Sequence, residues 1–439
     1  MSTLAEHATG WADGAWDEAR GLLWNPPGSF DDDGLAPRSV HMVPQSAWYA
    51  VGLLARGDTA RGDTARAERV LSELCALQYD RPRSVWHGTF ARFAEWPEPP
   101  EKGAVQWVDY DPNWRQFLGT TFAVILDEFG VSEDVAARLR AAIDRAIAGE
   151  PRDRVPPSYS NIALMKAWLE RDETFASAVV DCFDEFGAFD EYGSPTYYGI
   201  DLFALALWSR RPPTPAFRTW GERLWSELWR DIGRWWHPRL RNLCGPYSRA
   251  YGMDMTRYVG LLGLWLPDPV VPSLSTPFEH SHDVTMAALI RLVGGGPKDV
   301  AFDDSERVVE QVLPGGRVAT GWISSDVMVG GERGGRFRAE GQYHPATVHW
   351  SAPDRSAGWL RLRHAGPLSA TASTRELRVV VHDHHRLGRQ PVIVETSHPC
   401  VFGPDRWSLP GRTIGYDGPA VDTHGVIDAG GDDVLVLSL

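Results

Sequence analysis

The stretch Gly294-Gly295-Gly296-Pro297 separates two parts of the sequence that have different hydrophobic periods. Before it, apolar residues recur three and four positions apart, as at Leu224, Leu228 and Ile232, and this spacing indicates helices with one buried face. After it, apolar and polar residues alternate, as in residues 359–363, and this spacing indicates strands. The change of period therefore predicts an α+β protein with two domains.

The helical part is expected to form an (α/α) toroid over residues 1–297. Its candidate helices are mostly joined in pairs, and stretches rich in Pro, Gly and aromatic residues recur about once per pair. Loops of this kind gather at one end of a toroid, where a cleft forms between them. The candidate helices cover residues 5–24, 43–56, 63–79, 114–129, 133–149, 160–171, 173–187, 198–209, 216–236, 254–266 and 279–293.

The second part is expected to form an antiparallel β-sandwich over residues 298–439. Glycine pairs such as Gly315-Gly316 and Gly330-Gly331 mark turns between the strands. No low-complexity linker precedes this part, so we expect the sandwich to pack firmly on the helices. The candidate strands cover residues 308–312, 317–323, 346–350, 359–363, 377–382 and 434–437.

The composition limits the classes of partner. A net charge of −14 over 439 residues argues against nucleic acid, which needs clustered Lys and Arg. No run approaches the ~18 apolar residues of a membrane span, and residues 1–24 lack the basic start and apolar core of a secretory signal. These features predict a cytoplasmic protein with no membrane partner. Four scattered cysteines, without a CxxC pair, are expected to be small core residues.

Three similar stretches, each placed just before or at the start of a candidate helix, carry aromatic and amide groups. They are Tyr110-Asp111-Pro112-Asn113-Trp114-Arg115, Pro157-Ser158-Tyr159-Ser160-Asn161 and Ser194-Pro195-Thr196-Tyr197-Tyr198. Asp111 or Asn113 can cap one helix and Ser160 another. Because a helix N-terminus stabilises negative charge, converging starts favour an anionic substrate. The residues expected to bind it are Asp111, Asn113, Trp114, Arg115, Tyr159, Asn161, Tyr197 and Tyr198.

A fourth polar stretch covers residues 241–258 and supplies the candidates for catalysis. Tyr247, Arg249 and Tyr251 alternate in an extended segment, so their side chains can face one way. A nearby arginine favours the phenolate form of a tyrosine, which is the form that a general base needs. The catalytic candidates are Tyr251, Arg249, Tyr247 and Asn242, whereas Asp254 and Tyr258 are expected to bind substrate, with an Asp254–Arg257 ion pair as the structural alternative.

Histidines are possible partners for this chemistry. His344, on a turn of the sandwich, is the catalytic candidate from that side, and His282, near the domain junction, is expected to contact the substrate. The run His382-Asp383-His384-His385 places histidines on both faces of a strand, and no second group with ligand spacing is present, so no metal is expected there. The sequence has no P-loop, GxGxxG after a strand, GxSxG or HExxH, and no cofactor is expected.

A helical toroid followed by an antiparallel sandwich resembles the polysaccharide lyases of the heparinase and chondroitin/hyaluronate lyase type. The pattern Asn242…Tyr247-Ser248-Arg249-Ala250-Tyr251 is similar to the Asn, Arg and Tyr groups of those enzymes. The resemblance implies β-elimination, in which a tyrosine takes the proton α to a uronate carboxylate and Asn or Arg neutralises that carboxylate. Residues 110–115, 157–161 and 194–197 also resemble motifs of uncharacterised actinobacterial and fungal proteins.

Three other functions stay open at this point. An inverting glycoside hydrolase would use two of the carboxylates Asp111, Glu191, Asp201 and Asp254. A cyclase or isomerase of a terpene-like substrate would use tryptophans to stabilise carbocations, although the run Asp31-Asp32-Asp33 lies in a loop and not on a helix. A saccharide-binding protein without activity would need neither the catalytic carboxylates nor the carbocation-stabilising tryptophans. A lyase acting on a small or oligomeric, anionic saccharide is the first hypothesis, and the oligomeric state is not predicted.

Overall fold

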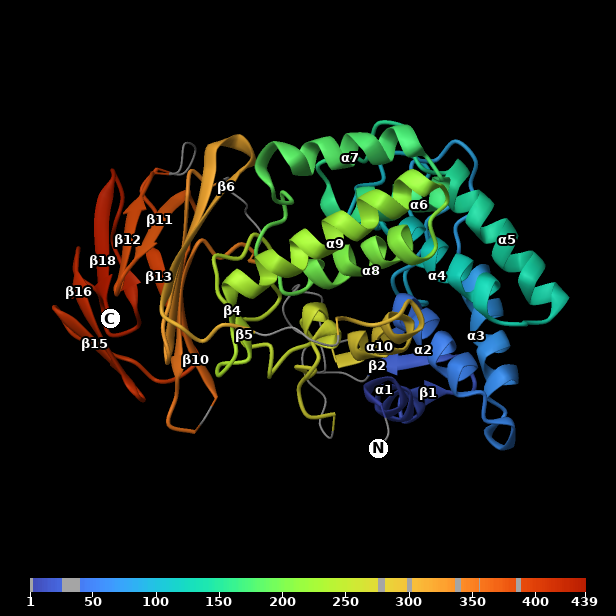
Figure 1. Cartoon of the computed structure of the whole chain (residues 1–439), viewed down its shortest axis with the longest axis horizontal. Coiled ribbons are helices and arrows are strands. Elements are labelled where there is room, and N and C mark those ends of the chain that lie inside the picture. Colours follow the sequence, from blue (N-terminus) through green and yellow to red (C-terminus); the bar gives the residue numbers. More distant parts are fainter. Residues whose placement is uncertain are drawn as a thin grey trace.

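The computed structural model describes residues 3–25, 40–274, 281–297, 302–335, 341–354, 356–383 and 388–439. It is an α+β structure, with helices in one half of the molecule and two layered antiparallel sheets in the other (Figure 1). The N-terminus lies with the helices and the C-terminus with the sheets (Figure 1). Among the described helices, none has the length and apolar character needed to cross a membrane.

The helices form two layers that differ in how much of each helix is buried. The inner helices pack in the order α2, α4, α6 and α8, and α10 lies against α2. Nearly every residue of α8 from Tyr198 to Trp208 is buried, whereas the outer helices bury one face only. The helices are α1 (Leu4–Asp13), α2 (Val43–Arg56), α3 (Asp63–Ala76), α4 (Trp114–Glu128), α5 (Glu133–Ala148), α6 (Ser160–Glu170), α7 (Glu173–Phe186), α8 (Tyr197–Arg210), α9 (Pro215–Trp235) and α10 (Met286–Leu292).

These helices agree with the sequence prediction except in three places. Closure of the array into a toroid stays a prediction. Residues 14–24 are not helical: a hairpin of β1 (Trp16–Asp17) and β2 (Leu22–Asn25) forms instead, with Gly21 at φ +69° in its turn, and β3 (Val40–Met42) extends it. The helix predicted over 254–266 is also wrong, as is the N-terminal part of the one over 279–293, where 3₁₀ turns at Leu261–Trp265 and Ser281–Thr285 occur.

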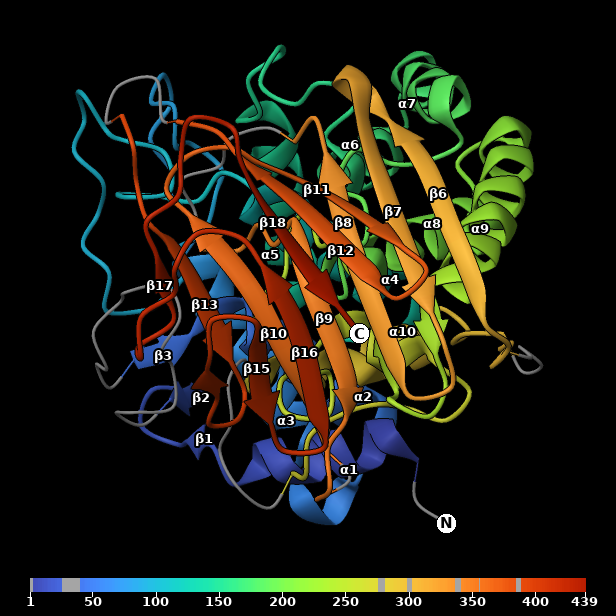
Figure 2. The same cartoon turned by 90° about the vertical axis from the view of Figure 1, so that its left-hand side faces the viewer.

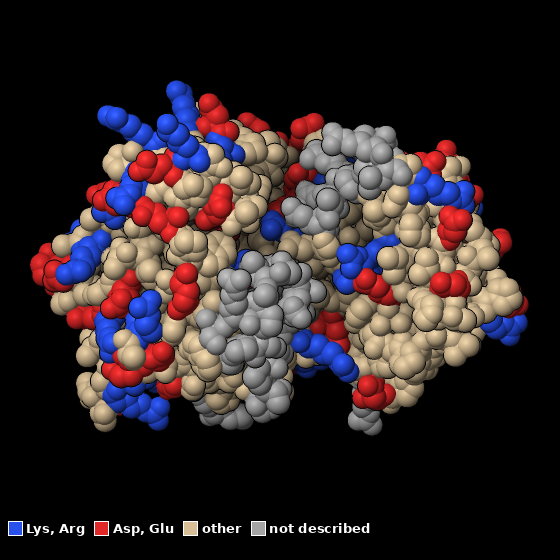
Figure 3. Space-filling view, turned by 180° about the vertical axis from the view of Figure 1, so that it is seen from behind, with Lys and Arg blue, Asp and Glu red and all other residues tan. Residues whose placement is uncertain are grey.

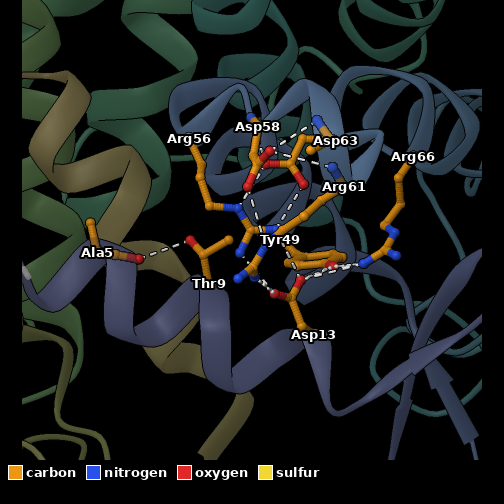
Figure 4. Close-up of polar contacts among 10 residues, drawn as sticks. Ala5, Thr9, Asp13, Tyr49, Arg56, Asp58, Arg61, Asp63 and Arg66 are labelled. Carbon is orange, nitrogen blue, oxygen red and sulfur yellow. Dashed lines mark hydrogen bonds and ion pairs between the residues drawn. The ribbon is translucent and has the colours of Figure 1, made fainter.

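A network of ion pairs fixes the tandem sequence Arg56-Gly-Asp-Thr-Ala and Arg61-Gly-Asp-Thr-Ala between α2 and α3 (Figure 4). Arg56 donates to Asp63 through Nε (2.7 Å) and to Asp13 of α1 through Nη1 (2.7 Å). The glycine of each copy ends a helix in the left-handed conformation, at φ +60° and +68°. The repeat therefore has a structural explanation, since each copy turns the chain and supplies charges that tie the first three helices together.

The sheets form the second half of the molecule and pack face to face (Figure 2). One sheet has seven strands in the order β17-β13-β10-β9-β8-β7-β6, and the other has six in the order β11-β12-β18-β16-β15-β14. The strands are β6 (Arg307–Leu313), β7 (Arg317–Ile323), β8 (Val327–Arg333), β9 (Ala346–Ser351), β10 (Ala357–His364), β11 (Leu368–Ser373), β12 (Glu376–Val381), β13 (Val392–Thr396), β14 (Val401–Phe402), β15 (Arg406–Leu409), β16 (Arg412–Asp417), β17 (Val426–Ile427) and β18 (Asp433–Ser438).

The seven-stranded sheet is buried on both faces where β7 and β8 meet the helical half. Every residue of β7 is buried, which an alternating strand with one wet face would not show. A Cβ added at Gly330 would lie 2.0 Å from the carbonyl carbon of Gly245, and one at Gly321 would lie 2.6 Å from the ring of Trp235. These glycines let the sheet approach the helical half closely. The expectation of a firmly packed junction fits these contacts, whereas a boundary at 297 stays a prediction.

Candidate functional site

The starts of α4, α6 and α8 converge, and polar side chains from all of them meet there. Asn113, which precedes α4, donates from Nδ2 to the Tyr159 hydroxyl at 3.0 Å. Asn161 in the first turn of α6 donates to the Glu191 carboxylate, which lies in the loop before α8. The three stretches singled out in the sequence thus lie side by side, although the prediction that Ser160 caps α6 is wrong because Tyr159 occupies the N-cap position.

Residues 241–258 form a further wall of the same site. Arg249 lies 3.4 Å from Glu191 through Nη1, and its guanidinium stands 4.6 Å above the centre of the Tyr197 ring. The Tyr197 hydroxyl is in turn 2.7 Å from the Tyr251 hydroxyl. We call this set the polar cluster, and its members are Asp111, Asn113, Tyr159, Asn161, Glu191, Tyr197, Arg249 and Tyr251.

The polar cluster is largely buried but keeps access to solvent. The Arg249 side chain is 22% exposed and that of Glu191 is 6% exposed, and Tyr197 and Tyr251 are half-buried. On the face opposite to that of Figure 1, the surface is hollowed between the helical half and the sheets, and both acidic and basic side chains show inside the hollow (Figure 3). A partly exposed group of this kind can receive a polar ligand while excluding most water.

Burial and neighbouring charges shift the pKa values of several groups in the polar cluster. Burial raises the pKa of Asp111, although the Asn113 N–H and the nearby arginines oppose this shift. Burial also raises the pKa of Tyr197 well above its usual range, and Arg249 offsets only part of the effect. Burial opposes the charge on Arg249 itself, but the tyrosines and Glu191 outweigh it and hold the pKa of Arg249 well above its usual range. Arg249 is therefore a fixed cation.

Two catalytic candidates of the 241–258 stretch lie outside the polar cluster. Tyr247 is fully buried and donates its hydroxyl to the Leu243 carbonyl at 2.5 Å, so the prediction that it faces the same way as Arg249 and Tyr251 is wrong. Asn242 is also fully buried; its side chain donates to the Met253 carbonyl at 2.7 Å and accepts from the Met255 N–H at 3.4 Å. Both residues hold the shape of the 242–255 loop.

His344 belongs to the junction between the halves. Its backbone pairs with that of Tyr247 (3.0 and 2.9 Å), and its Nε2 lies 3.1 Å from Arg361. Burial lowers the pKa of His344 well below its usual range, so the ring is neutral. A neighbouring histidine that the sequence did not single out, His349, is fully buried beside Tyr247, with its Nε2 2.9 Å from the Met253 carbonyl.

The burial of His349 predicts that acid weakens the folded state. Burial lowers the pKa of His349 to about 4, below the ~6.5 of an unfolded histidine. The unfolded chain therefore binds this proton first, so stability is complete above pH ~6.5 and is lost as pH falls toward ~4. The free energy of unfolding of the wild type minus that of His349→Gln, from urea titrations, should shrink by about 2 kcal/mol between pH 7 and pH 5.

The matched control for this prediction is His424→Gln, because His424 is exposed. Buried carboxyls such as Asp231, whose pKa burial raises to about 6, titrate with the opposite sign but are present in both proteins and cancel in the difference. A difference that stays constant with pH for His349→Gln would contradict the prediction.

The remaining candidates of the 241–258 stretch are also buried. Asp254 accepts from the Thr256 N–H and hydroxyl at 2.8 and 2.7 Å, which forms a turn where a helix was predicted. Asp254 also lies 3.6 Å from Arg257, so the predicted ion pair is confirmed. Tyr258 is buried with its ring under Gly252, where a Cβ would come within 2.5 Å of it. Both support the loop that carries Arg249 and Tyr251.

Four further candidates lie at the edge of the site or away from it. Arg115 is fully buried and donates to the carbonyls of Val85 (2.8 Å) and His87 (2.7 Å). Trp114 beside it packs against the Phe117 ring, with the ring centres 5.2 Å apart and the ring planes tilted. Tyr198 donates to Asp231 at 3.2 Å. His282 packs at 5.0 Å on the Trp11 ring of α1, and burial lowers its pKa to about 4.

Among the described residues, no group of His, Cys, Asp and Glu is arranged to hold a metal ion. His382 pairs with Asp432 at 2.7 Å. His384, His385 and the run Asp31-Asp32-Asp33 lie outside the described residues.

Two contributors to the site could not be found from the sequence. Gln342 of the sheet half accepts from Arg249 Nε at 2.7 Å, and Arg154 donates to Asn113 at 2.9 Å. Gln342 lies 93 positions from its partner, and no motif marks it. The sequence marks Glu191 only as a possible hydrolase carboxylate, whereas the fold makes it the partner of Arg249 and Asn161.

Comparison with known proteins places the helical half in a family. Residues 2–294 match the family described as "Domain of unknown function (DUF8769)". The chain belongs to the DUF8769 family. Because the match ends at residue 294, the polar cluster lies within the DUF8769 part, whereas Gln342 lies beyond it. No curated protein matches the chain.

Among solved structures, the chain is similar to a xanthan lyase of Paenibacillus, with 12% identity and a TM-score of 0.37. The alignment covers 99% of this DUF8769 chain and 56% of the lyase, so the chain spans about half the length of that enzyme. A likeness at this TM-score carries no argument for the function of the present protein.

Proposed function

We propose that this DUF8769 protein is a lyase that cleaves a uronic-acid-containing saccharide by β-elimination. The observation that carries the proposal is the contact between the Tyr197 and Tyr251 hydroxyls (2.7 Å) beside the guanidinium of Arg249. A pair of phenol oxygens next to a fixed cation can both move a proton and neutralise a carboxylate. These are the two requirements of proton abstraction from the carbon next to a carboxylate.

In the proposed step, Tyr251 is the base. With the Tyr197 hydroxyl as donor in their hydrogen bond, Tyr251 reacts as the phenolate, and its oxygen accepts the C5 proton of the uronate. The electron pair of the C5–H bond forms the C4=C5 double bond, and the C4–O bond to the next sugar breaks. Tyr251 then gives this same proton to the leaving oxygen, which restores the phenolate. No oxidant, reductant or water is consumed.

Arg249 and the amides of the cluster would hold the substrate carboxylate. Negative charge that develops on this carboxylate when the C5 proton leaves is stabilised by a cation that needs no reorganisation. Asn113 and Asn161 lie at the starts of α4 and α6, where backbone N–H groups also favour an anion. The site therefore suits a saccharide that carries a carboxylate.

The direct test is an assay of the purified chain on oligosaccharides of alginate, hyaluronate, chondroitin and glucuronan. A lyase produces a C4=C5 double bond conjugated with the carboxylate, so ultraviolet absorbance should rise together with the number of reducing ends. Reducing ends that appear without this absorbance would overturn the proposal.

An inverting glycoside hydrolase is the second candidate, because the polar cluster contains carboxyl groups in two different environments. Burial raises the pKa of Asp111, which suits a general acid, whereas Glu191 is paired with Arg249, which suits a carboxylate base. An inverting enzyme needs such a pair about 6.5–9.5 Å apart. Hydrolysis would release a saturated product of inverted anomeric configuration, which nuclear magnetic resonance identifies.

A further inference from the structure

A short segment of the sheet half lies against the 241–258 wall of the site. Residues 342–344 run antiparallel to residues 247–250: Tyr247 and His344 exchange both backbone hydrogen bonds (3.0 and 2.9 Å), and the Ala250 N–H donates to the Gln342 carbonyl (2.9 Å). The pairing is an isolated antiparallel bridge, and the bond from Ala250 lies one position out of the register of a regular ladder. It places the Gln342 side chain next to that of Arg249, even though the two residues belong to different halves of the molecule.

The contacts of Arg249 show what Gln342 does there. The amide oxygen of Gln342 accepts from Arg249 Nε at 2.7 Å. The Glu191 carboxylate accepts from Arg249 Nη1 at 3.4 Å. The backbone carbonyl of Arg249 accepts from the Ser194 hydroxyl at 2.5 Å, which fixes the base of the side chain. Within the described residues, no hydrogen bond involves Nη2, so this edge of the guanidinium is left to a ligand.

We propose that Gln342 is a positioning residue: it holds Arg249 by Nε, so that the remaining edge of the guanidinium faces the substrate carboxylate. This inference rests on the proposed function, since it assigns the carboxylate of the substrate to Arg249. A neutral amide at this position anchors the guanidinium without cancelling its charge, whereas a carboxylate would compete with the ligand. The sheet half is then part of the binding site and not only a support for the helices.

The test measures binding by calorimetry, so that it does not depend on turnover. The probes are a uronate oligosaccharide and the same oligosaccharide after reduction of its carboxyl groups to alcohols. Gln342→Glu and the nearly isosteric Gln342→Met should each weaken binding of the uronate form about tenfold or more, which corresponds to the loss of one charge-assisted contact. Binding of the reduced form should be the same in the wild type and both variants.

The matched control is Gln311→Glu. Gln311 of β6 also accepts from an arginine across the same junction, Arg234 Nη1 at 3.2 Å, but lies outside the polar cluster. This variant should bind the uronate form as the wild type does. Thermal unfolding of each variant shows that it is folded before binding is measured.

The outcomes separate this inference from the proposed function. Uronate binding that is unchanged in both Gln342 variants, or weakened equally for the reduced form, overturns the positioning role. Selective weakening without any unsaturated product from the wild type supports Gln342 and overturns the lyase. Failure of the wild type to bind any uronate oligosaccharide overturns both.

Discussion

Replacing Tyr251 by phenylalanine is expected to lower turnover of the uronate substrate by about 10²- to 10⁴-fold, the usual contribution of a general base. The substitution removes the oxygen that accepts the C5 proton and leaves the half-buried ring in place. Stability should therefore stay close to that of the wild type. The measurement is the rate of ultraviolet absorbance increase at saturating substrate, together with the thermal unfolding midpoint of each protein.

The matched control is Tyr416→Phe, which removes a hydroxyl that donates to the Pro419 carbonyl at 2.5 Å in the sheet half. Turnover of this variant should equal that of the wild type. Full activity in Tyr251→Phe would reject the assignment of the base. Tyr197, whose hydroxyl lies 2.7 Å from that of Tyr251, would then be the next candidate for the base.

Replacing Arg115 by leucine is expected to lower the free energy of unfolding by about 3 to 5 kcal/mol, because it breaks a buried charge network. Arg115 is fully buried, holds the carbonyls of Val85 and His87, and lies 3.6 Å from the buried Glu150 carboxylate. Burial lowers its pKa to about 10, and Glu150 opposes that shift. Urea unfolding at pH 7 measures the loss.

Arg138→Leu is the control for this change. Arg138 pairs with Asp134 at 2.9 Å on the surface of α5, and such an exposed pair contributes less than about 1 kcal/mol. If Arg115→Leu unfolded at the same urea concentration as the wild type while losing substrate binding, Arg115 would belong to the binding site, as the sequence pattern suggested. The structure instead makes it the support of the loop that precedes α4.

Local signals predicted most of the helices and strands. The period of α9 is visible at Leu224 and Leu228, and its start follows from Pro215. The predicted helices that are wrong lie where tertiary contacts outweigh the local hydrophobic pattern. Residues 14–24 pair as a hairpin because Gly21 permits the turn. The 254–266 segment starts with a turn in which the Asp254 side chain accepts from the Thr256 N–H, and it continues into a short 3₁₀ turn and not an α-helix.

The sequence predicts that polar residues at the helix starts lie together, but it does not predict which of these residues reach the site. A recurring sequence pattern predicts Asn113, Tyr159 and Tyr197 as site residues, and the structure places all three in the polar cluster. Tyr198 has the same local sequence context as Tyr197, yet it points into the core and donates to Asp231. Successive residues at a helix start point in directions about 100° apart, so only the packing of α8 decides which of the two reaches the site.

The order of amino acids alone predicts the change from helices to strands near Gly294, and it shows the polar character of the helix starts and of the 241–258 stretch. These properties depend on residue type and on contacts between near neighbours in the chain. Long-range packing fixes the rest: it buries Tyr247 and Asn242. It also brings Arg249 and Tyr251 to Tyr197, and adds Gln342 from the other half. Contacts between residues far apart in the chain leave no period in the sequence, because they are fixed by how the layers pack.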